Sequence, residues 1–131
     1  MSESIIHINL VKGIKKWLIE SNIVDEAAIF TSLPESNTEN KCPRFIDGRE
    51  PDVYAKDLRS KLLIIGEAKT ENDIFTAHSK AQYISYLNYA QNYYNETLIV
   101  YSVPSMCKVQ MKNHINNLYG QIPSKVKVII V

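Results

Sequence analysis

The most constraining feature of this sequence is the run Leu-Leu-Ile-Ile-Gly-Glu-Ala at residues 62–68, which is apolar except for Glu67. A short run of this kind is typical of a strand whose sheet is covered by helices on both faces. Glu67 and the following Lys69 stand at its end, where burying a charge is costly unless a partner compensates it. We therefore expect a central strand of an α/β sheet with a polar site at one end.

The segments around this strand alternate between helical and strand-like patterns. Apolar residues recur at three- and four-residue spacing in residues 4–21, 76–95 and 105–119, which predicts three helices. In the first helix, the stripe expected to face the core consists of Ile6, Leu10, Ile14, Trp17 and Leu18. Runs at 27–32, 52–56, 97–103 and 125–131 predict further strands, and the polar segment 34–50 predicts a long loop with room for a short strand at 44–46. The predicted order is α-β-β-β-α-β-α-β, an α/β fold with a mixed sheet flanked by helices.

Length and composition narrow the class of protein. A chain of 131 residues, 45% hydrophobic and 22% charged, suits one soluble globular domain spanning residues 1–131. No run approaches the roughly 20 apolar residues of a membrane span, and the N-terminus does not read as a secretory signal, so we expect a cytoplasmic protein with no membrane contact. The net charge of +1 lacks the strong basic excess of a dedicated nucleic-acid coat.

Three charged residues form a candidate site. Residues two apart in a strand point to the same face, so Glu67 and Lys69 project together. If the strand at 52–56 pairs with the central strand as a hairpin, the Asp52 carboxylate reaches the same point. Two carboxylates and an ammonium suit a magnesium-dependent phosphodiesterase, with the backbone carbonyl of Ala68 as a further ligand. An ion-paired strand end without catalytic function is the plainer alternative.

The same residues resemble a known nuclease signature. Pro51-Asp52, followed after fourteen residues by Glu67-Ala68-Lys69, resembles the PD-(D/E)xK motif. Residues 48–55 and 63–69 are similar to the N-terminal nuclease domain of type I restriction R subunits and to archaeal Holliday-junction resolvases. Residues 82–86, Gln-Tyr-Ile-Ser-Tyr, match the Q-x-x-x-Y motif of RecB-type nucleases. The resemblance covers about residues 1–104 and implies a restriction-endonuclease-like αβββαβ core, to which this chain adds a C-terminal helix and strand.

The resemblance assigns roles to individual residues. Asp52 and Glu67 would be metal ligands, Lys69 the catalytic lysine, and Gln82 and Tyr86 auxiliary groups near the metal or the DNA backbone. Many members of the family add an acidic residue from the first helix, for which Glu20 is the candidate here. The implied activity is a DNA endonuclease dependent on Mg²⁺, with Mn²⁺ as a substitute.

The expected partners follow from the same resemblance. Arg44, Arg49 and Lys80 flank the predicted site and are the candidate phosphate contacts. One site cuts one strand, so we expect a homodimer or a partner that supplies specificity. A second hypothesis is a nucleic-acid-binding or assembly module that keeps the nuclease fold with little cleavage. The tyrosines of the second helix, at positions 83, 86, 89, 93 and 94, are either core and interface residues, which we favour, or a stacking surface for bases.

Overall fold

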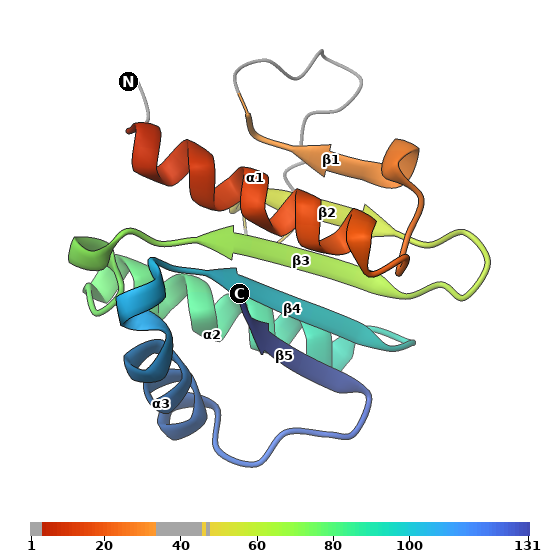
Figure 1. Ribbon diagram of the computed structural model, residues 1–131. Coiled ribbons are helices and arrows are strands. Elements are labelled where there is room, and N and C mark those ends of the chain that lie inside the picture. The colour runs from red at the N-terminus through yellow and green to blue at the C-terminus, as the bar shows by residue number, and fades with distance from the viewer. Residues whose placement is uncertain (1–3, 34–45, 47) are drawn as a thin grey trace.

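The computed structural model, which describes residues 4–33, 46 and 48–131, has a five-stranded sheet between two helical layers (Figure 1). The helices are α1 (Ile5–Glu20), α2 (Ala77–Asn92) and α3 (Lys108–Tyr119). The strands are β1 (Ile29–Thr31), β2 (Val53–Lys56), β3 (Leu63–Ala68), β4 (Thr97–Ser102) and β5 (Val126–Ile130). Short 3₁₀ turns precede β1, α2 and α3, at η1 (Glu26–Ala28), η3 (Glu71–Asp73) and η4 (Ser105–Cys107). The predicted order of helices and strands is confirmed.

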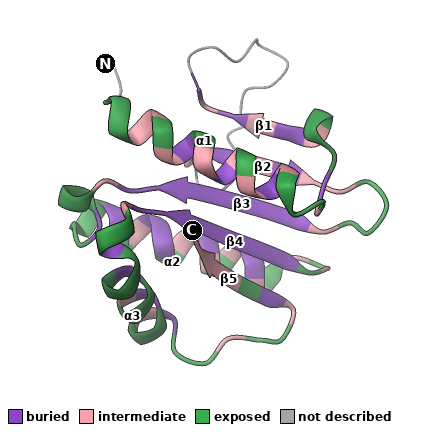
Figure 2. Cartoon of the chain, in the orientation of Figure 1, coloured by how far each residue is buried: buried purple, intermediate pink, exposed green. Residues whose placement is uncertain are grey.

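The sheet is mixed, as predicted, and its strands lie in the order β1-β2-β3-β4-β5. β2 pairs antiparallel with both β1 and β3, whereas β3, β4 and β5 run parallel. A short turn at residues 57–62 suffices for the antiparallel pair, while α2 and α3 supply the long crossovers that parallel neighbours need. All six residues of β3 are buried, which confirms a central strand covered on both faces (Figure 2).

Helix α1 covers one face of the sheet, but its contact stripe differs from the predicted one. The buried residues are Val11, Ile14 and Leu18, whereas Ile6 is 59% exposed and Leu10 is only partly buried. Positions 11, 14 and 18 form a single line at spacings of three and four residues at the centre of the contact with the sheet, and Leu10 and Trp17 pack at its edge. The predicted stripe is therefore correct at Ile14 and Leu18, which are buried, and wrong at Ile6, whose place in the core is taken by Val11.

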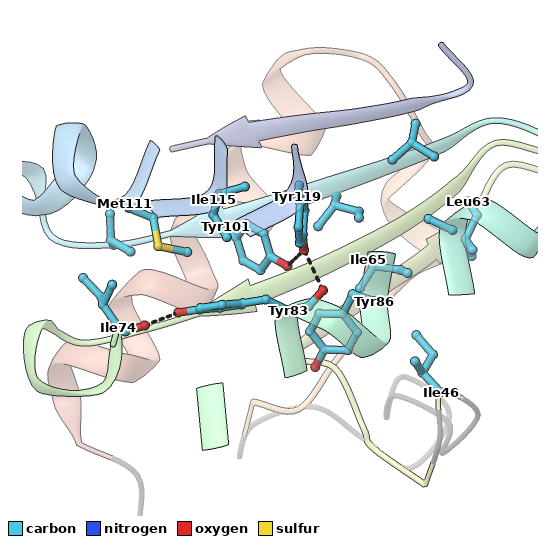
Figure 3. Close-up of a cluster of buried hydrophobic side chains, with 14 of the residues drawn as sticks. Ile46, Leu63, Ile65, Ile74, Tyr83, Tyr86, Tyr101, Met111, Ile115 and Tyr119 are labelled. Carbon is cyan, nitrogen blue, oxygen red and sulfur yellow. Dashed lines mark hydrogen bonds between the residues drawn. The ribbon is translucent and has the colours of Figure 1, made fainter. Parts of the chain in front are cut away.

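Helices α2 and α3 cover the opposite face over a cluster rich in tyrosine (Figure 3). Tyr83 donates to the carbonyl of Ile74 at 2.9 Å, and Tyr119 donates to the carbonyl of Tyr83 at 2.8 Å. The hydroxyls of Tyr101 and Tyr119 are also hydrogen-bonded to each other. These bonds give the buried hydroxyls partners, which lets polar rings fill an apolar core.

Local signals set several boundaries. Ser4 caps α1 by accepting from the His7 N–H at 3.1 Å, and Thr76 caps α2 by accepting from the Ser79 N–H at 3.1 Å. Helix α3 ends before Gly120, whose φ of 61° suits glycine. Of the predicted short strand at 44–46, only Ile46 lies within the described residues, and it forms a bridge with Arg49.

Candidate metal centre

The hairpin of β2 and β3 brings Asp52 and Glu67 together at one end of the sheet. Val53 pairs with Gly66, so the next position along each strand places Asp52 opposite Glu67. Glu67 alternates with Ile65 and therefore projects to the face covered by α2. The two residues are only 7% and 5% exposed. Two carboxylates this deeply buried need compensation from their surroundings.

Asp52 is held by hydrogen bonds from three different elements. Its Oδ2 accepts the Ala68 N–H at 2.9 Å and lies 3.2 Å from Nε2 of His7, while its Oδ1 accepts the Ser32 hydroxyl at 3.2 Å. The N–H of Ala68 points toward β2, and in an extended strand the carbonyl of the same residue points to the same side. The Ala68 carbonyl therefore faces the side of β3 on which Asp52 lies.

Glu67 and Lys69 are tied to α2 by the two residues of its Q-x-x-x-Y motif. Tyr86 donates to Oε1 of Glu67 at 2.5 Å, and the ammonium of Lys69 donates to Oε1 of Gln82. Nζ of Lys69 also lies 3.9 Å from Oε2 of Glu67. Gln82 and Tyr86 are one helical turn apart, so one face of α2 holds both charged side chains of the β3 end. The five residues predicted from the sequence thus lie in one connected cluster.

His7 belongs to this cluster and was missed in the sequence. It lies in the first turn of α1, four residues before Val11 and therefore on the buried line of the helix. The usable signal was this register, because a histidine in line with a buried stripe faces the sheet. The predicted stripe ran through Ile6 and Leu10 and therefore left His7 off the face expected to meet the sheet. The spacing of the three histidines also gave no sign of metal binding.

His7, Asp52 and Glu67 form a set of atoms that fits a divalent cation. Each offers one ligand atom, and these three atoms all lie within 4.8 Å of one another. Ligands on opposite sides of a Mg²⁺ or Mn²⁺ ion are about 4.2 Å apart, so small side-chain rotations would complete the fit. Carboxylate oxygens suit Mg²⁺ and Mn²⁺ alike, whereas an imidazole nitrogen suits transition metals better than Mg²⁺.

The two carboxyl groups have opposite pKa shifts. Burial, followed by the negative charge of Asp52, raises the pKa of Glu67 well above its usual 4.5. Burial also acts to raise the pKa of Asp52, but hydrogen bonds from His7, Glu67 and the Ala68 N–H outweigh it and lower this pKa. Of the two carboxyl groups, Glu67 is therefore the one that takes up a proton more readily in the absence of a cation. A bound cation would replace this proton.

Tyr86 is a fixed donor in this arrangement. Burial and the neighbouring Glu67 raise the pKa of Tyr86 far above its usual value, so the hydroxyl keeps its proton. Arg49 is close enough to Tyr86 for its charge to act on that hydroxyl. Its Nε is buried and has no hydrogen-bond partner within the described residues. A buried guanidinium N–H with no acceptor, near the Tyr86 hydroxyl, is suited to an anion that approaches the site.

The remaining candidates lie elsewhere. Glu20 is at the far end of α1 from His7, about 20 Å along the helix axis, and its exposed carboxylate is 4.0 Å from Lys16. The structure therefore does not bring Glu20 to the cluster. Lys80 is exposed and acts electrostatically on His114, on the side of α2 toward α3. Arg44 lies outside the described residues.

No protein-family model, curated protein or solved structure matches this chain. None of the helices in the described part of the chain is long and apolar enough to cross a membrane.

Proposed function

We propose that this chain is a metal-dependent nuclease of the PD-(D/E)xK type with a restriction-endonuclease-like fold. The observation that carries the proposal is the convergence of His7, Asp52 and Glu67 within 4.8 Å, with Lys69 bonded beside them. An ion-paired strand end would need one carboxylate for one ammonium. Here two buried carboxylates compete for a proton next to an imidazole, an arrangement that destabilises the empty site and favours a cation.

The expected chemistry is hydrolysis of a DNA phosphodiester. Asp52, Glu67 and His7 would hold the cation, which is Mg²⁺ or Mn²⁺ by its ligands. When bound, the cation would polarise the phosphate and acidify a water molecule. The water loses a proton as its oxygen bonds to phosphorus, and the departing oxygen gains a proton as its bond to phosphorus breaks.

The other residues of the cluster position and stabilise charge. The Lys69 ammonium, held by Gln82, would donate to the phosphate as negative charge develops on it. Tyr86 fixes the orientation of Glu67 through its 2.5 Å hydrogen bond. Arg49 would donate its free Nε to a phosphate oxygen, which is the role expected for it from the sequence.

Cleavage of plasmid, linear duplex and branched DNA in Mg²⁺ and in Mn²⁺ tests the proposal. Asp52→Asn and Glu67→Gln keep the shape of each side chain and should reduce cleavage by at least about 100-fold, as should Lys69→Met, because each removes a charge at the reacting phosphate. Glu96→Gln, an exposed carboxylate at the other end of the sheet, is the matched control and should cleave normally.

Two results would contradict the proposal in different ways. Binding of DNA without cleavage in every metal would favour the alternative of a nucleic-acid-binding module with the nuclease fold. Cleavage that survives all three substitutions would show that the reaction occurs elsewhere in the chain.

A further inference from the structure

A second concentration of charge and aromatic side chains lies at the opposite end of the sheet from the metal centre. Nζ of Lys56 lies 5.7 Å from the ring centre of Tyr93 and 5.6 Å from that of Tyr94. The two tyrosine rings are 4.7 Å apart, and Tyr94 is 67% exposed. We call Lys56, Tyr93 and Tyr94 the tyrosine–lysine patch.

The patch is fixed in place by hydrogen bonds between Tyr93 and two other segments of the chain. The Tyr93 hydroxyl donates to the carbonyl of Lys61 in the turn between β2 and β3, at 3.4 Å. The ammonium of Lys125, just before β5, donates to the Tyr93 carbonyl at 2.6 Å. Tyr94 is the next residue, and its ring stays largely exposed to solvent beside Tyr93 and Lys56.

The surroundings of the patch are mainly cationic. Lys56, Arg59, Lys61 and Lys125 all belong to this end of the molecule. The nearby Asp57 carboxylate is occupied by the Ser60 hydroxyl at 2.6 Å and by N–H groups of the same turn. An exposed aromatic ring within a cationic surface matches the combination that binds single-stranded nucleic acid, in which bases stack on rings and phosphates contact lysines.

The patch and the metal centre share one face of the sheet. Asp52 and Lys56 lie four residues apart along β2, about 13 Å in an extended strand, and an even spacing places them on the same face. Tyr86 lies in α2, and Tyr93 directly follows the last residue of that helix, about 10 Å further along the helix axis. The two sites are therefore a few nucleotides apart, and Figure 1 shows α2 running along the length of the sheet behind the strands.

We propose that the tyrosine–lysine patch binds an unpaired segment of the DNA strand whose phosphodiester lies at the metal centre, with a base stacked on Tyr94 and a phosphate on Lys56. This inference rests on the proposed nuclease function for the position of the cleaved bond. Binding at the patch itself needs no metal. The preferred substrate is then DNA with a single-stranded arm, because a base inside a duplex cannot stack on a protein ring.

Fluorescence anisotropy with labelled oligothymidylates of about 4 and about 12 nucleotides, in EDTA, tests the patch directly. The longer strand should bind more tightly to the wild type. Lys56→Gln and Tyr94→Ala should each weaken its binding about fivefold or more. Lys56→Gln should also lower the slope of log affinity against log salt by about 0.7, whereas Tyr94→Ala should leave it unchanged. Phe75→Ala and Lys108→Gln, an exposed aromatic and an exposed lysine outside the patch, are the matched controls and should bind normally.

Tyr94→Trp separates stacking from packing, because a larger ring should tighten binding without any need for the fold to change. Equal binding of the longer strand by wild type, Lys56→Gln and Tyr94→Trp would overturn the inference.

In Mn²⁺, the patch variants should raise KM for substrates with a single-stranded arm and leave kcat unchanged. If the wild type binds the longer strand as expected but never cleaves DNA, the proposed nuclease function is wrong and binding at the patch is retained. If the wild type cleaves DNA and the patch variants bind as tightly as the wild type, the proposed role of the patch alone is wrong.

Discussion

At the scale of single residues, the positive charges and hydrogen-bond donors of the cluster only partly offset the cost of burying its two carboxyl groups. Asp52 receives hydrogen bonds from His7, Ser32 and the Ala68 N–H, and the bonds from His7 and Ala68 help to lower its pKa. Glu67 is equally buried, but its charge is opposed by burial and by Asp52. The cluster is therefore most stable with one extra positive charge, either a proton or a metal ion.

Replacing His7 tests which residue of α1 completes the metal centre. His7→Ala should weaken Mn²⁺ binding by at least about tenfold, because even residues that only orient a ligand typically contribute 10- to 100-fold. It should also reduce any preference for Mn²⁺ over Mg²⁺, since the nitrogen ligand is lost. Isothermal titration calorimetry measures both effects. Glu20→Gln is the control, and a loss of Mn²⁺ affinity in this variant with His7→Ala unaffected would reverse the assignment.

Glu67→Gln should stabilise the metal-free protein while it removes metal binding. A raised pKa in the folded state means that folding takes up a proton above pH 4.5, so the contribution of Glu67 to stability is present at low pH and is lost as pH rises through the folded pKa. Glutamine imitates the protonated acid at every pH. In thermal unfolding in EDTA, the midpoint temperature of the variant should exceed that of the wild type by an amount that grows with pH. A gain of about 1 kcal/mol in stability corresponds to a difference of up to a few degrees. A constant or shrinking difference would contradict the raised pKa.

At the scale of elements, the position of α1 depends on a glycine in the central strand. A Cβ built on Gly66 would lie 2.9 Å from Cβ of Val53 and 3.1 Å from Cγ2 of Ile14. The neighbouring strand and the helix thus approach β3 more closely than any side chain at this position permits. The same close approach brings the first turn of α1, with His7, to the end of β2.

Gly66→Ala and Gly13→Ala form a matched pair for this point. Gly66→Ala should destabilise the protein by about 1–3 kcal/mol through overpacking. A Cβ on Gly13, within α1, would meet its nearest neighbour, Oγ of Ser102, at an ordinary 3.8 Å, so Gly13→Ala should stabilise by about 0.5–1 kcal/mol through helix propensity. Urea denaturation measures both changes. Equal effects of the same sign would show that α1 does not depend on contact at Gly66.

At the scale of the whole molecule, buried tyrosines join α2, α3 and the sheet. Tyr119 of α3 bonds to the hydroxyl of Tyr101 in β4 and to the carbonyl of Tyr83 in α2. Helix α3 is therefore connected to the part of the fold that carries the candidate metal centre, since Tyr83 is adjacent in α2 to Gln82. Removing this connection should lower the stability of the molecule without touching the site.

Tyr119→Phe should destabilise the protein by about 1–3 kcal/mol, because it leaves the Tyr101 hydroxyl and the Tyr83 carbonyl buried without this partner. Mn²⁺ affinity and cleavage should remain within about twofold of the wild type at temperatures where the variant is folded. Denaturant unfolding and calorimetry check the two halves of the prediction. A large loss of metal affinity in a folded variant would mean that α3 helps to shape the centre.

The sequence by itself determined the helices, the strands and their order, and it marked Asp52, Glu67, Lys69, Gln82 and Tyr86 as residues that would meet. The elements and the meeting of Asp52, Glu67 and Lys69 were accessible because hydrophobic periodicity and strand alternation are local properties of the chain, whereas Gln82 and Tyr86 were named through the resemblance to the Q-x-x-x-Y motif. The tertiary structure decided how α1 is rotated, which replaced the expected Ile6 by Val11 in the core and brought His7 instead of Glu20 to the cluster. It also divided the tyrosines, burying Tyr83 and Tyr86 and exposing Tyr94. The rotation of a helix and the exposure of a ring depend on the neighbours that the rest of the fold supplies, which local pattern does not specify.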